Sequence, residues 1–168
     1  MPRLALIRKS AEPFGWMGNM SRFPVVWQEK CFPTSEHLFQ CLRFSDPEII
    51  EHIRAENNPM KAKWFAKGKA TEMTVEPLSL QDVQNMLMVL KLKLEQHPEL
   101  KEQLIATEDA IIIEDCTKRQ GGSGLFWGAA LKENVWTGRN MLGKLWMKLR
   151  TELIPGTVEG ERNESWVQ

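Results

Sequence analysis

The chain contains no tyrosine and no excess of charge of either sign. Its 168 residues include 22 Lys and Arg against 22 Asp and Glu, so the formal net charge is zero at neutral pH. A balanced chain lacks the general attraction to nucleic acid of a strongly basic protein, although a local basic patch remains open. The apolar run near the N-terminus covers only residues 4–7, too short for a signal peptide or a membrane span. We therefore expect a cytoplasmic protein that does not enter a membrane.

Cysteine is also scarce. The three cysteines, Cys31, Cys41 and Cys116, are odd in number and show no paired spacing. This pattern argues against a disulfide framework and favours a reducing compartment. No Cys-x-x-Cys or His-x-x-x-His spacing points to a bound metal. The sequence therefore predicts neither a metal site nor a cofactor.

Two kinds of aromatic residue are abundant where tyrosine is absent. There are seven Trp and seven Phe, and hydrophobic residues make up 42% of the chain. A chain of this length is sufficient for one domain with a proper core. Because a buried indole N–H needs a hydrogen-bond partner, so many tryptophans require a large core or an aromatic-lined pocket.

The hydrophobic pattern predicts an α+β fold, a mainly helical single domain with a small β-sheet. We place this domain at residues 1–154 and a polar C-terminal tail at 155–168. Strands are expected at 3–8, 25–32 and 110–113, from their β-branched and apolar runs. Helical spacing and cap residues predict helices at 35–44, 46–56, 60–69, 79–96, 98–105 and 138–153.

The most informative segment is residues 33–44, where an acidic residue and a histidine stand together in the first turn of an amphipathic helix. Thr34 or Ser35 is the expected N-cap, and the helix dipole favours a negative charge at Glu36. On these residues alone Glu36 is either a capping glutamate or a rigidly aimed acid. His37, next to it, is either a core residue or part of a site.

Four separated segments, in this order, resemble the NADAR family. The first contains Glu36, His37, Gln40 and Phe44, and the second runs from Pro59 through Ala62 and Lys63 to Gly68 and Lys69. The third joins Met86, Leu90 and Lys93 to the stretch 97–104, and the fourth contains Trp127-Gly128 followed by Gly138-Arg139-Asn140, Gly143 and Arg150. The resemblance extends over about residues 14–153.

This resemblance implies a hydrolase that cleaves the bond between a ribose anomeric carbon and a nitrogen. Some family members act on phosphoribosylamino-pyrimidine intermediates of riboflavin synthesis, and others remove ADP-ribose from guanine in DNA. The implied partner is therefore a nucleotide-like small molecule or ADP-ribosylated DNA. Glu36 is the first candidate for catalysis, because a carboxylate stabilises an oxocarbenium-like centre or moves a proton. Lys63 and Lys30 compete for a second role, as a phosphate-binding cation or as a Schiff-base nucleophile.

Six further residues are implied to bind substrate: Asn19, His37, Trp127, Gly128, Asn140 and Arg150. The Asn19 amide would bond ribose hydroxyls or a base edge. The Trp127 indole would stack on a base, next to a glycine that permits close backbone approach. Asn140 would stand at a helix N-terminus, where phosphates bind readily.

The chain departs from the family pattern at two places. Gly124 stands where many members carry an aspartate three residues before Trp-Gly, and Leu78 or Leu80 where many carry a tryptophan. Because glycoside hydrolysis usually uses two acidic groups, Glu114 or Asp115 would have to supply the second. The alternative is a catalytically silent module that binds ADP-ribose or another NAD derivative.

Overall fold

Among the described residues the strands form three two-stranded pairs, and helices make up most of the remaining structure. The structure is a computed structural model, and it describes residues 2–154. The strands are β1 (Leu4–Ile7), β2 (Val25–Trp27), β3 (Lys30–Phe32), β4 (Ile111–Glu114), β5 (Ala130–Lys132) and β6 (Val135–Thr137). The helices are α1 (Ser35–Cys41), α2 (Pro47–Ala55), α3 (Pro59–Gly68), α4 (Leu80–Gln96), α5 (Pro98–Ile105), α6 (Gly124–Trp127) and α7 (Met141–Leu153), with 3₁₀ turns at Gly15–Met17 and Ala70–Glu72. The predicted α+β class is confirmed, and the expected tail at 155–168 lies outside the described residues.

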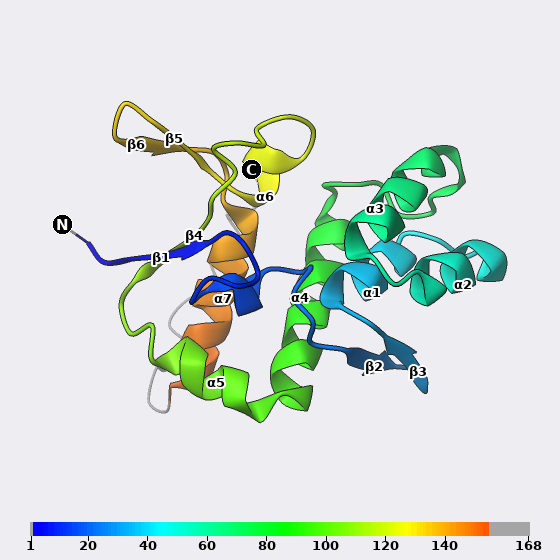
Figure 1. Cartoon of the computed structure of the whole chain (residues 1–168), viewed down its shortest axis with the longest axis horizontal. Helices are drawn as coiled ribbons and strands as arrows, with labels where there is room; N and C mark the ends of the chain where they lie inside the picture. The colour runs from blue at the N-terminus through cyan, green and yellow to red at the C-terminus, as the bar shows by residue number, and fades with distance from the viewer. Residues whose placement is uncertain (1, 155–168) are drawn as a thin grey trace.

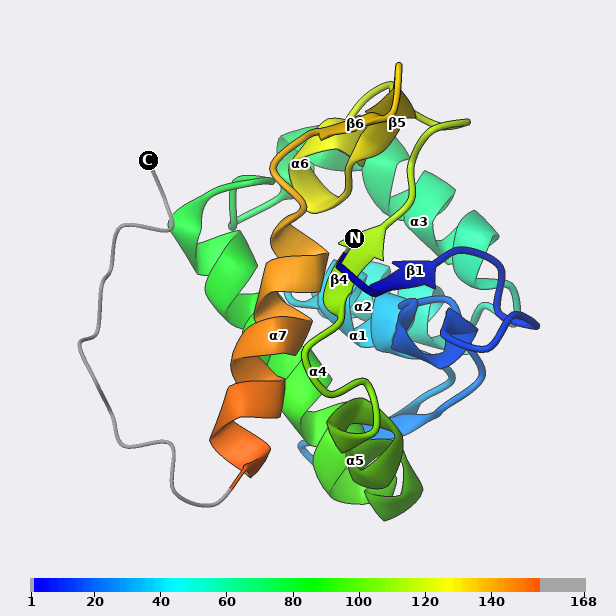
Figure 2. The same cartoon turned by 90° about the vertical axis from the view of Figure 1, so that its left-hand side faces the viewer.

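Helix α4 runs through the middle of the molecule (Figure 1). Helices α1, α2 and α3 and the β2–β3 hairpin lie on one side of it, while β1, β4, α5 and α7 lie on the other. Figure 2 shows α7 packed along the β1–β4 pair, with α6 and the β5–β6 hairpin beyond its N-terminal end. No helix within residues 2–154 has the length and apolar character required to cross a membrane.

The one parallel pair among the described strands joins β1, near the N-terminus, to β4, which follows α5. Leu4 pairs with Ile111 and Ile7 with Glu114, so β1 and β4 end side by side. Parallel strands need a long connection, and here the residues between them form α1 to α5. This register brings Glu114 to the same end of the sheet as the loop that follows β1.

Two hairpins correct the strand and helix predictions. The expected strand at 25–32 folds back at Gln28 and Glu29, which both have positive φ, 48° and 63°. The expected helix from 138 instead begins at Met141, because the preceding residues form β6 and turn back at Glu133 and Asn134, with φ of 46° and 64°. Such two-residue turns match the twist of the strands. Neither turn contains the glycine that usually marks one in a sequence.

Side-chain caps fix the first turn of most long helices. The Thr34 side chain accepts the His37 N–H, which settles the choice of N-cap for α1. Asp46, Asn58 and Ser79 cap α2, α3 and α4 in the same way. The predicted starts of these helices are confirmed to within a residue or two, since capping residues are read directly from the sequence.

Gly143 allows α7 to approach the backbone of β4 closely. A Cβ added there would lie 2.2 Å from the Ile112 carbonyl oxygen and 2.5 Å from the Asn140 side chain. We expect Gly143→Ala to lower the free energy of unfolding by about 1–3 kcal/mol or more, because the helix must move off the strand. Urea denaturation measures this. Gly68→Ala is the matched control, since an added Cβ there meets nothing within 4 Å, and equal loss in both variants would contradict the argument.

Candidate active site

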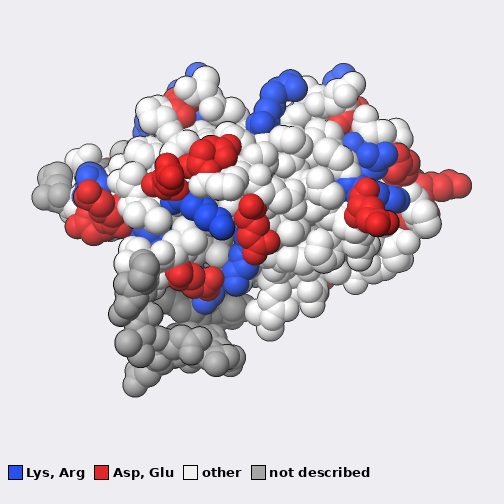
Figure 3. Space-filling model, turned by 90° about the horizontal axis from the view of Figure 1, so that it is seen from below, with Lys and Arg blue, Asp and Glu red and all other residues white. Residues whose placement is uncertain are grey.

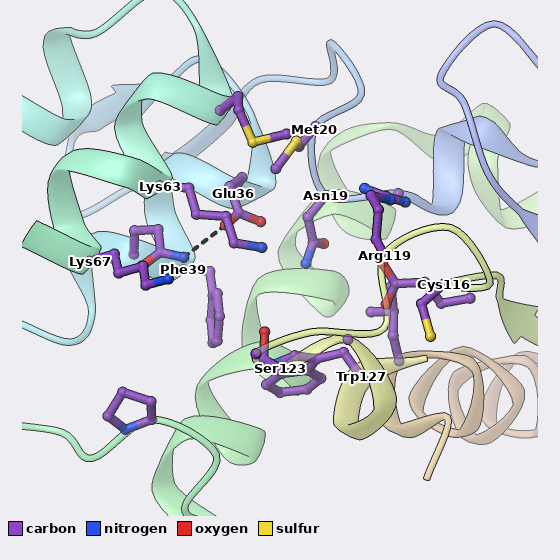
Figure 4. Close-up of a pocket in the computed structure, with 18 of the residues that line it drawn as sticks. Asn19, Met20, Glu36, Phe39, Lys63, Lys67, Cys116, Arg119, Ser123 and Trp127 are labelled. Atoms are coloured by element: carbon purple, nitrogen blue, oxygen red, sulfur yellow. Dashed lines mark hydrogen bonds between the residues drawn. The ribbon is translucent and has the colours of Figure 1, made fainter. Parts of the chain in front are cut away.

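A cavity of about 550 Å³ opens where the α1–α3 helices face the end of β4. Its walls come from segments far apart in the sequence: the loop 18–20, α1, α3, the segment before α4, and the stretch from β4 to α6. Figure 4 shows Glu36, Lys63 and Asn19 reaching into this space from three different segments, with Trp127 below them. These four sequence candidates line the same cavity.

Glu36 is held rigidly in the first turn of α1. Its side chain lines the cavity although the residue is only 5% exposed. The Gln40 amide, one turn later, donates to Glu36 Oε1 at 2.7 Å. No hydrogen bond to the other carboxylate oxygen occurs among the described residues, so that oxygen is available to a ligand or water.

The Gln40 amide is oriented in turn by a buried ion pair. Arg43 NH1 donates to Gln40 Oε1 at 3.2 Å, and the same guanidinium binds Asp82 with two hydrogen bonds of 2.9 and 2.7 Å. Asp82 has no exposed side-chain surface. Paired donors and acceptors of fixed geometry thus connect α4 to the Glu36 carboxylate and fix its direction.

Asn19 belongs to a loop that is hydrogen-bonded to α1. Its backbone carbonyl accepts the Glu36 N–H at 2.9 Å. Its side-chain nitrogen lies 3.1 Å from the Met86 sulfur, and its side-chain oxygen is buried without a partner in the described structure. A buried acceptor without a donor carries a free-energy cost that a ligand donor removes. Asn19 is therefore suited to accept a hydrogen bond from a bound molecule.

The ammonium group of Lys93 holds the other end of this loop. It donates to the Trp16 and Gly18 carbonyl oxygens, the latter at 3.2 Å, and to Ser21 Oγ at 2.9 Å. Lys93 has no exposed surface, and burial lowers its pKa to about 7. No carboxylate pairs with it in residues 2–154. Its charge is instead solvated by the loop that carries Asn19.

Glu114 and Asp115, the two carboxylates offered as a second acid, have different surroundings. Glu114 lines the cavity, and burial raises its pKa although the nearby Lys63 acts in the opposite direction. Asp115 points to Arg8, which it binds at 2.8 Å. Burial of Asp115 opposes its ionisation, but hydrogen bonds from Thr117 and the Arg8 charge lower its pKa. Of Glu114 and Asp115, Glu114 is therefore the carboxyl group that more readily stays protonated, and it lies in the same cavity as Glu36.

Trp127 closes the floor of the cavity. It is 8% exposed and makes edge-to-face contacts with Phe39, at 5.6 Å between ring centroids, and with Phe126, at 5.0 Å. Most of the indole is therefore used in packing. Gly128, which follows it, is required by the backbone, because a Cβ there would lie 2.4 Å from the Glu114 carbonyl oxygen.

Five sequence candidates do not line this cavity: Lys30, His37, Gly128, Asn140 and Arg150. Lys30 lies exposed on β3. His37 is fully buried, with its ring nitrogens 2.8 Å from Thr34 Oγ1 and 2.7 Å from the Glu56 carbonyl oxygen. The geometry therefore does not support a substrate-binding role for His37 or a catalytic role for Lys30.

Asn140 and Arg150 serve the packing of α7. The Asn140 side chain accepts the Glu114 N–H at 3.0 Å and donates to the Ile112 carbonyl at 2.8 Å. Arg150 donates to Thr107 Oγ1 and to the Ala110 carbonyl. These contacts correct the expectation that both side chains face the substrate. Their polar groups are satisfied by the backbone and side chains near β4 and α5.

Arg119 and Trp64 also line the cavity, and neither is among the residues predicted from the sequence. Arg119 follows β4 in a glycine-rich loop, and Trp64 lies between lysines on α3. A tryptophan within a lysine-rich polar helix is a signal that could have found the second. Arg119 reaches the cavity through the course of its loop, and no pattern in the sequence marks it. Within residues 2–154, no group of three or more His, Cys, Asp or Glu is placed to hold a metal ion.

Each of the four segments that carried the resemblance in the sequence contributes residues to the cavity. A family model described as the NADAR domain matches residues 6–154. The chain belongs to the NADAR family. The match includes every segment that lines the cavity, from the loop before α1 to α7.

Relatives in this family are named for N-glycosidase activity. The chain is 31% identical to N-glycosidase YbiA of Escherichia coli K12 over 144 residues, which covers 86% of this chain and 84% of that protein. It is 32% identical to N-glycosidase YbiA of Shigella boydii, with the same coverage. The class of enzyme is that of a hydrolase acting on N-glycosyl bonds.

Two further NADAR comparisons extend this picture. The NMR structure of E. coli YbiA superposes with a TM-score of 0.72 at 29% identity, covering 97% of this chain and 92% of that one. A maize protein named riboflavin biosynthesis protein PYRR, chloroplastic, is 25% identical over 164 residues, and the matched region is 25% of its length. The fold is therefore that of YbiA.

Proposed function

We propose that this NADAR protein hydrolyses the bond between C1 of a ribose and a nitrogen of a heterocyclic leaving group. The observation that carries the proposal is the pair formed by Glu36 and Glu114. The two carboxyl groups share one cavity and differ in their hydrogen bonds: Glu36 accepts one from the Gln40 amide, whereas the Glu114 carboxyl group accepts none within residues 2–154 and burial raises its pKa. Two acids in contrasting environments are the usual arrangement for one to give a proton and the other to receive one.

The two acids divide the reaction between them. Protonated Glu114 gives its proton to the leaving nitrogen as the C1–N bond breaks, and the negative Glu36 stabilises the positive charge that develops on the ribose. A water then adds to C1 and loses a proton to Glu36. At the end Glu36 is protonated and Glu114 is charged, so one proton returns through solvent before the next cycle. The buried Asn19 oxygen accepts a hydrogen bond from a hydroxyl or amino group of the bound substrate.

Lys63 has two possible roles in this scheme. It lies close enough to Glu114 for its charge to act on that group. As a cation it would bind a substrate phosphate. As a free amine it would attack C1 of the opened sugar, form a Schiff base and release the base, and water would then cleave the intermediate. Borohydride reduction during turnover separates the two roles, because only a Schiff base leaves a covalent adduct on the protein.

The substrate is either an ADP-ribosylated guanine in DNA or a phosphoribosylamino-pyrimidine. The face of the molecule in Figure 3 mixes acidic and basic side chains and has no broad basic surface to follow a DNA backbone. Incubating the protein with each compound and following sugar release by mass spectrometry tests the proposal. Activity that falls steeply with salt favours DNA. Binding of ADP-ribose with release from neither compound would overturn the hydrolase in favour of a silent binding module.

Glu114 supplies a prediction about pH. We expect Glu114→Gln to lower kcat by about 100-fold or more, because the leaving nitrogen loses its proton donor. Since the group acts while protonated and its pKa is raised, wild-type activity falls as the pH rises through that raised pKa. The variant should lack this alkaline limb. The kcat–pH profiles of both proteins measure the effect.

Asp115→Asn is the matched control for this prediction. Asp115 is the next residue and also bears a carboxyl group, but it binds Arg8 and does not line the cavity. It should retain the wild-type pH profile. If the alkaline limb were lost in Asp115→Asn and kept in Glu114→Gln, the proton donor would be Asp115 and not Glu114.

A further inference from the structure

Trp64 stands apart from the other tryptophans of residues 2–154. It is 64% exposed, yet it lines the same cavity as Glu36. No ring contact or hydrogen bond of this side chain occurs in residues 2–154. A single exposed apolar side chain is ordinary on a protein surface. An unpartnered indole in the wall of a reaction cavity is not, because it offers a free aromatic face to whatever enters.

Cationic side chains line the same cavity as this indole. Lys63 precedes Trp64 on α3 and Lys67 follows it by one turn, and both line the cavity. Within residues 2–154, the ion pair at the end of α3 joins Lys69, its C-cap, to Glu72, and Lys63 and Lys67 form none. The ammonium groups of Lys63 and Lys67 are therefore available to a ligand. Arg119 lines the cavity from the loop after β4. A free aromatic face in a cavity that also holds cations favours a flat ring attached to an anion.

The neighbouring wall is apolar and fixed in place. Pro77 and Leu78 line the cavity just before α4. Leu78 is 36% exposed and has a positive φ of 66°, a conformation that is costly for a residue with a branched side chain. The Leu78 N–H donates to the buried Asp82 carboxylate at 2.8 Å, which holds the segment in this form. The strained segment thus keeps an apolar surface at the same cavity as Trp64.

Trp127, the other tryptophan in the cavity, cannot offer the same surface. It is 8% exposed, and the rings of Phe39 and Phe126 pack against it. Stacking of a base on an indole needs an accessible aromatic face. Of the two, Trp64 alone provides one.

We propose that Trp64 is a stacking platform for an aromatic heterocycle of the substrate, and that Lys67 neutralises a phosphate joined to it. The ligand is thus a nucleotide, with base, ribose and phosphate recognised together. The inference rests on the proposed function, since it assigns a binding role within the same cavity. It adds a specificity residue that acts on binding and not on the chemistry at C1.

Two small probes isolate the aromatic ring. AMP and ribose 5-phosphate share the sugar and the phosphate, and only AMP carries a base. Calorimetry should show that Trp64→Ala lowers the affinity for AMP by about tenfold or more and leaves that for ribose 5-phosphate unchanged. Trp64→Phe should retain most of the AMP affinity, since it keeps an aromatic face. Trp136→Ala, in the β6 strand away from the cavity, is the control for loss of a tryptophan.

The outcomes separate this proposal from the hydrolase assignment. Unchanged AMP affinity in Trp64→Ala, equal losses for both probes, or no binding of AMP to the wild type would each overturn the platform. In those cases, release of sugar from either candidate substrate would still support the hydrolase assignment. Conversely, if the wild type releases no sugar but AMP affinity falls in Trp64→Ala, the stacking role of Trp64 is supported and the hydrolase assignment is overturned.

Discussion

Replacing Glu36 with glutamine is expected to lower kcat by about 10³-fold or more while the protein stays folded. Glutamine has the shape of glutamate, and its amide oxygen can still accept the hydrogen bond from Gln40. It carries no negative charge, so it neither stabilises the positive ribose nor takes a proton from water. A loss of this size corresponds to about 4 kcal/mol of transition-state stabilisation. Single-turnover measurement of sugar release gives the rate of the chemical step directly.

Glu48→Gln is the matched control for this experiment. Glu48 also stands in the first turn of a helix, α2, but it is exposed and does not line the cavity. Both variants lose one negative charge near a helix N-terminus, so any effect on stability through the helix dipole is shared. Wild-type turnover in a folded Glu36→Gln protein would remove Glu36 from the mechanism.

The sequence was most informative where a local rule decides the structure. A capping side chain and an apolar stripe are enough to place α1, because both effects act within one helical turn, but they leave open whether Glu36 caps the helix or faces a site. The hairpins were missed for the opposite reason. Gln28-Glu29 and Glu133-Asn134 adopt left-handed turns without glycine, so tertiary pairing overrides a weak local preference there.

The cavity itself could be predicted only in part. Glu36 and Glu114 are far apart in the chain, and they meet because β4 pairs with β1 in one register. A shift of one residue would turn Glu114 to the opposite face of the strand. The family resemblance located Glu36, Lys63 and Trp127 in the cavity. It could not separate them from Asn140, whose amide is used by the backbone of β4.

The apolar stripe of α4 shows the same limit at a second place. Spacing predicts an inward row that includes Leu80, yet Leu80 is 53% exposed, and two charged residues, Asp82 and Lys93, are fully buried on the inner face. Hydrophobic periodicity assigns a face and does not reveal buried charges that have polar partners. Those partners, Arg43 and the loop 16–21, come from elsewhere in the chain.

Lys93 carries the second large prediction, which concerns stability and activity together. The unfolded chain holds this proton with the ordinary pKa of 10.5, and the folded protein holds it with a pKa of about 7. Between these values the unfolded state binds more protons, so the contribution of Lys93 to the free energy of unfolding rises with pH. Below about pH 7 the cost of burying the charge is fully present, and above 10.5 it is absent. The full change is roughly 4–5 kcal/mol.

We expect Lys93→Met to remove this rise. Urea denaturation at pH 7 and at pH 10 should show the stability of the wild type gaining several kcal/mol relative to the variant over that interval. The variant should also lose activity by about tenfold or more. Without the ammonium group the loop 16–21 loses its donor, and that loop positions Asn19 and accepts the Glu36 N–H.

Lys91→Met separates the buried charge from the loss of a lysine as such. Lys91 lies on the same helix, and its ammonium makes an exposed ion pair with Glu152 at 3.4 Å. Such a pair contributes at most about 1 kcal/mol, so this variant should follow the wild type at both pH values. If Lys93→Met and the wild type instead gained equal stability between the two pH values, folding would not bury the charge of Lys93. The ammonium group of Lys93 also organises the loop beside Glu36. Lys93→Met should therefore alter the pH dependence of stability and lose turnover, and Lys91→Met should do neither.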